Sequence, residues 1–282
     1  MQKTAIIISI SSDIGLAMAQ RWLDRGYRVF GTYRTQSPGV LSLMDRGVGL
    51  VQCDLGDGAS VDGASRALAA ACGSWDVLVV APGSTEPIGP FADLPFDQWE
   101  QSIAVNFTSQ LRITHGLLPS RSQLAEQGPC VLYFAGGGTN NATVNYSAYT
   151  ISKIALIKMC ELLDAEIPDS RFAIVGPGWV KTKIHAETLR AGSAAGSNLQ
   201  RTQEKLDQGD FTPMERVLDC CDWVIAAPRE VISGRNFSVV FDAWDDQDLA
   251  AALRADPNMY KLRRAGNDRL AAPTPTSETA LR

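Results

Sequence analysis

The sequence predicts a single α/β domain built on a doubly wound, parallel, seven-stranded sheet. Short apolar runs of strand length alternate with amphipathic helical stretches along most of the chain. The strand runs are apolar without alternation, which is typical of a parallel sheet that helices cover on both faces. Hydrophobic residues make up 45% of the 282 residues, which is enough for one large core.

Seven strands and six main helices follow from this pattern. We expect strands at residues 3–9, 28–33, 50–53, 76–80, 129–135, 172–175 and 236–241, and helices at 14–25, 40–47, 61–72, 96–118, 146–165 and 214–226. The strand–helix alternation predicts a dinucleotide-binding architecture of the Rossmann type over residues 1–262. Residues 263–282 are rich in polar residues, glycine and proline and are expected to form a disordered tail.

Composition argues against several classes of function. The net charge of −5 offers no electrostatic footprint for nucleic acid or for an anionic membrane. The apolar run Ala5–Ile8 is too short for a signal sequence or a membrane span, so we expect a cytoplasmic protein. Six cysteines without CxxC spacing and only two histidines predict reduced thiols and no metal site.

The first strand-to-helix turn, residues 9–15, is the candidate phosphate-binding loop. Such a turn presents backbone N–H groups and a helix N-terminus to a pyrophosphate. An ordinary N-cap by Ser12 or Asp13 is the alternative interpretation. A carboxylate near a phosphate would cost roughly 4 kcal/mol, so we expect Asp13 to point away and cap its own helix. The candidate cofactor-binding residues of this turn are Ser9, Ser11, Ser12, Ile14 and Gly15.

Tyr149 and Lys153 form the strongest chemical signal in the sequence. Their i, i+4 spacing places both side chains on one face of a helix. A neighbouring ammonium favours the phenolate and is expected to lower the pKa of the tyrosine. The pair can then exchange a proton with a carbonyl or carbinol oxygen during hydride transfer, although an isolated YxxxK match is common by chance.

In this context, residues 1–242 resemble the short-chain dehydrogenase/reductase family of the single-domain type with a YxxxK active site. Landmarks in the right order carry the resemblance: Asp54-Leu55, Ala81-Pro82-Gly83, Asn106, Ser147 to Ala155, and Pro177 to Thr182. The resemblance implies that Asp54 contacts adenine, that Asn106 anchors a proton-relay water and that Thr182 contacts the nicotinamide. The cofactor-binding residues that it adds are Asp54, Leu55, Ala81, Pro82, Gly83, Tyr149, Lys153, Pro177, Gly178, Val180 and Thr182.

The sequence departs from the family pattern at two places. Ser9 and Asp13 replace the first two glycines of the phosphate-binding turn. The family's catalytic serine ends the fifth strand, where this chain has Ala135 and Gly136. Thr139, Asn140 or Ser147 are candidate replacements, and we favour Thr139 as the catalytic hydrogen-bond donor. Losing one such donor costs on the order of 3 kcal/mol in the transition state.

Arg34 bears on the choice of cofactor. An acidic residue at the end of the second strand would bind the adenosine 2′-hydroxyl and indicate NAD, but no Asp or Glu follows that strand until Asp45. Arg34 follows it instead and can pair with a 2′-phosphate, unless it is an ordinary solvated surface arginine. We therefore expect NADP, with NAD as the alternative.

The resemblance implies an enzyme that interconverts a carbonyl and a secondary alcohol on a small molecule, with residues 184–212 as the substrate lid. A sugar or nucleotide-sugar substrate is our hypothesis. A catalytically weak NAD(P)-binding sensor or scaffold, and an epimerase or dehydratase, are the competing interpretations. The family resemblance also implies a homo-oligomer, either a tetramer or a dimer.

Overall fold

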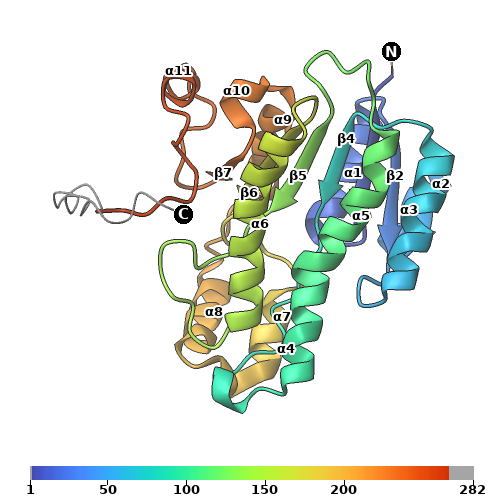
Figure 1. Ribbon diagram of the computed structural model, residues 1–282. Coiled ribbons are helices and arrows are strands. Elements are labelled where there is room, and N and C mark those ends of the chain that lie inside the picture. The colour runs from blue at the N-terminus through green and yellow to red at the C-terminus, as the bar shows by residue number, and fades with distance from the viewer. Residues whose placement is uncertain (1, 267–282) are drawn as a thin grey trace, which may run out of the picture.

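The computed structural model describes residues 2–266 and contains one seven-stranded parallel sheet (Figure 1). The strand order is β3-β2-β1-β4-β5-β6-β7, which confirms the predicted fold class. Strands β2 and β3 are added on one side of β1, whereas β4 to β7 are added on its other side. Open sheets of this type bind ligands at the switch point between β1 and β4. The strands are β1 (Thr4–Ile8), β2 (Arg28–Tyr33), β3 (Gly49–Gln52), β4 (Val77–Val80), β5 (Cys130–Phe134), β6 (Arg171–Gly176) and β7 (Arg235–Ser238).

Helices cover both faces of this sheet because its strands are apolar on both sides. In β1, Ala5 and Ile7 face one core cluster, whereas Ile6 and Ile8 face the other. The first cluster is completed by α1 (Asp13–Asp24), α2 (Pro38–Asp45) and α9 (Met214–Ala226). The second is completed by α3 (Gly58–Cys72), α5 (Ser109–Leu117) and α6 (Ser147–Glu166). Within residues 2–266, no helix is both long and apolar enough to cross a lipid bilayer.

The helix that the sequence predicts over residues 96–118 is interrupted. The chain forms α4 (Phe96–Ile103), a π-helical turn at Ala104–Thr108 and then α5. The predicted seventh strand is also too long, because the backbone turns after Ser238. There the Ser238 N–H donates to the Asp242 carboxylate at 2.6 Å, and the Asp242 N–H donates to the Ser238 carbonyl at 3.2 Å.

Two regions hold helices that the sequence pattern did not predict. Residues 184–212 form α7 (His185–Ala191) and α8 (Ser197–Gln208), which lie beyond the carboxyl ends of the strands (Figure 1). The chain also forms α10 (Arg229–Ile232) and α11 (Gln247–Ala255) on either side of β7. Most of the expected tail, residues 267–282, lies outside the described part of the chain.

Candidate active site

One cavity of about 1920 Å³ opens at the carboxyl ends of the strands. All the site residues predicted from the sequence line it except Gly15, Asn106 and the candidate donor Ser147. The structure therefore brings together the turn after β1, the ends of β2 to β6, and the start of α6. The predicted residues along the cavity are Ser9, Ser11, Ser12, Ile14, Arg34, Asp54, Leu55, Ala81, Pro82, Gly83, Thr139, Tyr149, Lys153, Pro177, Gly178, Val180 and Thr182.

The turn after β1 has the shape of a phosphate-binding loop although it contains one glycine. Ser9 adopts a left-handed backbone with φ 62°, a conformation that glycine usually supplies. Ser12 caps α1, because its hydroxyl accepts from the Gly15 N–H at 3.1 Å. A β-carbon on Gly15 would lie 2.7 Å from the Ser9 carbonyl oxygen, so only glycine fits there. Gly15 therefore allows the backbone to turn tightly at this point, although it does not itself line the cavity.

Asp13 binds a distant segment of the chain. Its carboxylate accepts from the Lys183 backbone N–H at 2.8 Å, and the Lys183 ammonium lies 3.8 Å from its other oxygen. The expectation that Asp13 caps its own helix is therefore wrong, because Ser12 does so. Instead, Asp13 ties the first turn to the loop after β6.

Arg34 directly follows β2 and lines the cavity. Within residues 2–266, its guanidinium forms no hydrogen bond or ion pair. Nearby, Asp54 stabilises its own loop by accepting from the Gly56 N–H at 2.8 Å. An unpaired guanidinium beside a helix N-terminus suits an anionic ligand such as a phosphorylated nucleotide.

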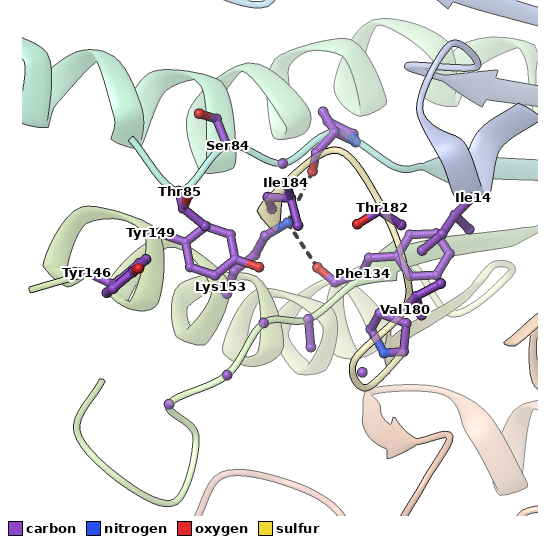
Figure 2. A pocket seen from close by; sticks show the side chains of 18 of the residues that line it. Ile14, Ser84, Thr85, Phe134, Tyr146, Tyr149, Lys153, Val180, Thr182 and Ile184 are labelled. Atoms are coloured by element: carbon purple, nitrogen blue, oxygen red, sulfur yellow. Dashed lines mark hydrogen bonds between the residues drawn. The ribbon is translucent and has the colours of Figure 1, made fainter. Parts of the chain in front are cut away.

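Lys153 is buried and its position is fixed. Its ammonium donates to the Phe134 carbonyl at 3.0 Å and to the Pro82 carbonyl at 3.2 Å, at the ends of β5 and β4 (Figure 2). Burial lowers the pKa of Lys153 to about 8. The nitrogen lies 5.8 Å from the centre of the Tyr149 ring. The i, i+4 spacing thus brings the two side chains together as predicted.

The pKa of Tyr149 does not follow the prediction. Burial, together with the nearby Glu187 carboxylate, raises the pKa of Tyr149 to about 12. The expectation of a lowered pKa is wrong for this structure, because burial and the Glu187 carboxylate both disfavour the phenolate. At neutral pH the Tyr149 hydroxyl therefore keeps its proton and is an acid rather than a base.

Gly136 leaves room for the Tyr149 hydroxyl just after β5. A β-carbon at Gly136 would lie 2.6 Å from that hydroxyl oxygen. The next residues, 137–139, follow the cavity wall to Thr139. Neither Ala135 nor Gly136 provides a side-chain hydroxyl, as the sequence indicated.

Glu187 is a partner of the active site that sequence reasoning missed. Its carboxylate on α7 accepts from the Thr85 N–H and the Thr85 hydroxyl, both at 2.6 Å, and from the Ser84 hydroxyl at 3.2 Å. Ser84 and Thr85 line the cavity beside Tyr149 (Figure 2). No local motif marks Glu187, since Thr85 precedes it by 102 residues. It fixes the first helix of segment 184–212 against the loop after β4.

Asn106 supports the same loop from behind. Its side chain is fully buried in the π-helical turn. Its amide donates to the Ser84 carbonyl at 2.8 Å, and its amide oxygen accepts from the Ser84 N–H at 3.0 Å. Both polar ends of Asn106 are therefore engaged by one residue, and the side chain does not reach the cavity.

The comparisons with known proteins agree with this geometry. A family model described as short chain dehydrogenase matches residues 3–192. The chain is 28% identical over 250 residues to the "Monensin polyketide synthase putative ketoacyl reductase" of Streptomyces virginiae, covering 84% of this chain and 95% of that protein. It is 26% identical over 170 residues to the "D-threitol dehydrogenase" of Mycolicibacterium smegmatis, covering 58% of this chain and 64% of that protein.

Solved structures share the fold. The crystal structure of a variant of actinorhodin polyketide ketoreductase with NADPH superimposes with a TM-score of 0.71 at 21% identity, covering 84% of this chain and 95% of that chain. The crystal structure of the KRED1-Pglu enzyme gives a TM-score of 0.74 at 21% identity, covering 83% of this chain and 100% of the other.

Proposed function

Because this chain belongs to the short chain dehydrogenase family and is an NAD(P)-dependent oxidoreductase, we propose that it reduces a ketone to a secondary alcohol with NADPH. The observation that carries this proposal is the placement of Tyr149 beside the buried Lys153 in the cavity that the phosphate-binding turn also lines. Two relatives are named putative ketoacyl reductases, which favours a ketone on a carbon chain over a sugar.

The cavity residues fit NADP. The turn 9–14 and the N-terminus of α1 would hold the pyrophosphate, and the unpaired Arg34 would pair with the 2′-phosphate. Asp54 would lie by the adenine, with Val180 and Thr182 by the nicotinamide. When bound, NADPH supplies the hydride.

Tyr149 donates the proton in this scheme. A phenol with a pKa of about 12 remains protonated at neutral pH and can protonate the oxygen of the ketone as it becomes an alkoxide. The Lys153 ammonium, fixed by two carbonyls, places positive charge beside that oxygen. Thr139 supplies a second hydrogen bond to the oxygen from the loop after Gly138.

Absorbance of NADPH tests this function. We expect the purified protein to oxidise NADPH when given a β-ketoacyl thioester and to do so more slowly with NADH. Keto sugars are assayed as substrates for reduction with NADPH, and D-threitol is assayed as a substrate for oxidation with NADP⁺. Comparison of these rates with the rate for the ketoacyl thioester separates the substrate classes. Micromolar nucleotide binding without turnover of any ketone, sugar or polyol would instead identify a sensor or scaffold protein.

A further inference from the structure

The wall of the cavity beside Tyr149 is polar. Two segments form it, the loop 84–86 after β4 and residues 185–190 of α7. All the residues of these two segments that line the cavity have polar side chains, except Ala186. Figure 2 shows Thr85 of this wall with Tyr149. Polar groups that a ligand covers are costly unless the ligand pairs with them, so this wall suits a substrate with a polar group close to its reacting carbon.

The Glu187 carboxylate brings a negative charge to this wall. Burial raises the pKa of Tyr149, and the Glu187 carboxylate raises it further, so this charge acts on the reactive hydroxyl. Within residues 2–266, Glu187 forms no ion pair, and Arg190 of the same helix is paired with Glu86 at 3.1 Å. Hydrogen bonds alone therefore offset the loss of water around this half-buried carboxylate.

One oxygen of this carboxylate has unused capacity to accept hydrogen bonds. Oε2 of Glu187 accepts from the N–H and from the hydroxyl of Thr85, both at 2.6 Å. In the described part of the chain, Oε1 accepts from the Ser84 hydroxyl alone, at 3.2 Å, which is long for a bond between two oxygens. A carboxylate oxygen accepts about two hydrogen bonds. Oε1 is therefore the atom that a donor on a bound substrate would meet.

Tyr146 and Thr188 add a donor to the same wall. Their hydroxyl oxygens lie 2.8 Å apart, both residues are buried, and both line the cavity. One hydroxyl donates to the other, so the accepting hydroxyl keeps a proton that has no partner among the described residues. Burial raises the pKa of Tyr146, and the Glu187 carboxylate raises it further, which places this pair near Glu187. The wall therefore offers one free acceptor and one free donor.

We propose that Glu187 and the Tyr146–Thr188 pair form a subsite for a hydroxyl group on the carbon next to the ketone of the substrate. This inference rests on the proposed ketone reduction and adds that the substrate is an α-hydroxy ketone. The hydroxyl donates to Oε1 of Glu187 and accepts from the Tyr146–Thr188 pair, while the ketone oxygen accepts from Tyr149, one turn beyond Tyr146. An ammonium group cannot accept and a carboxylate cannot donate, so neither meets both partners.

A matched pair of ketones tests the subsite. The first is 1-hydroxy-2-hexanone, and the second is 3-heptanone, which has a methyl group in place of the hydroxyl. We expect the wild-type protein to reduce the hydroxy ketone with a roughly tenfold higher kcat/KM, because a hydrogen bond to a charged group has an effect of at least that size. This comparison depends on no variant. Equal kcat/KM for the two ketones in the wild type would overturn the subsite.

Glu187→Gln separates substrate binding from the structural role of Glu187. The amide oxygen can keep both bonds from Thr85, while the amide nitrogen donates to the Ser84 hydroxyl and cannot accept from a substrate. Amide exchange in α7 should therefore stay close to that of the wild type, but the preference for the hydroxy ketone should fall to about one. Because the ratio compares two ketones in one variant, the effect of the lost charge on Tyr149 cancels. Glu204→Gln, outside the cavity on α8, is the control, and a tenfold preference that persists in Glu187→Gln would contradict the assignment.

A binding measurement separates this inference from the proposed function. Calorimetry with 1,2-hexanediol and with 3-heptanol is carried out on the protein saturated with NADPH, which cannot oxidise an alcohol, so no turnover is needed. Roughly tenfold tighter binding of the diol by the wild type, and its loss in Glu187→Gln, supports the subsite even if no ketone is reduced. Equal affinity of the wild type for the two alcohols rejects the subsite even if the protein proves to be an active ketone reductase.

Discussion

The hydroxyl of Tyr149 lies against Gly136, so close that a β-carbon on Gly136 would stand 2.6 Å from the hydroxyl oxygen. Gly136 lies just beyond the end of β5, and Tyr149 lies in the first turn of α6. The position of the proton donor thus depends on the absence of a side chain at residue 136. A serine at residue 136 would displace the Tyr149 side chain. The space that the family's serine would fill is therefore taken by the Tyr149 hydroxyl in this chain.

Substitution of Gly136 is therefore expected to impair the enzyme. We predict that Gly136→Ser and Gly136→Ala both lower kcat on the order of a hundredfold, because a shift of about 1 Å in a reacting group has an effect of that size. Steady-state NADPH oxidation measures it. Gly137→Ala is the matched control, because a β-carbon at Gly137 meets nothing within 4 Å. A rate increase in Gly136→Ser would show that the site simply lacks the family's serine.

Arg34 should decide between the two nicotinamide cofactors. We predict that Arg34→Glu weakens NADPH binding by roughly a hundredfold, because it replaces an attractive charge with a repulsive one at the 2′-phosphate. NADH, which lacks that phosphate, should bind as before. Fluorescence titration gives both values, and Arg46→Glu is a control at a surface arginine outside the cavity. Equal loss of NADPH and NADH affinity would contradict the assignment.

The rate of reduction should depend on pH through Lys153. As pH rises through about 8, Lys153 loses its proton and with it the positive charge beside the ketone oxygen. Tyr149, with a pKa of about 12, remains an acid over the same range. We therefore predict that kcat/KM for reduction is highest below pH 8 and declines above it. A rate that rises continuously through that pH would indicate that neutral Lys153 is the active form.

Glu187 should control the order of α7. Its carboxylate accepts three hydrogen bonds from Ser84 and Thr85, and bonds to charged groups each contribute about 1.5–3 kcal/mol. We predict that Glu187→Ala speeds amide hydrogen exchange in residues 185–191 at least roughly tenfold, as followed by mass spectrometry. The exposed Glu204→Ala on α8 is the control. Unchanged exchange in α7 would mean that other contacts hold it.

The sheet and most of the cavity were predictable because their signals are local. Apolar strands, helical spacing and turn residues each lie within a short window, and parallel topology then places the strand ends together. Arg34, Tyr149 and Lys153 therefore meet in one cavity as the sequence indicated.

Features that depend on contacts between distant parts of the chain could not be predicted from the sequence. The helical pattern of residues 96–118 gives no sign of the π-helical turn, where Asn106 binds the backbone of Ser84. The polar helix α8 buries only Thr202, so its periodicity is weak. Asp13 and Glu187 each bind backbone far along the chain, and no spacing rule identifies such partners.

Replacement of Tyr149 by phenylalanine tests the central claim most directly, because it removes one oxygen atom and keeps the ring. We predict that Tyr149→Phe lowers NADPH-dependent ketone reduction by about a thousandfold, in the range that general acid catalysis contributes, and leaves the Kd for NADPH within a factor of about two. Reduction at the wild-type rate by Tyr149→Phe, with NADPH still bound, would contradict the assignment of Tyr149 as the proton donor.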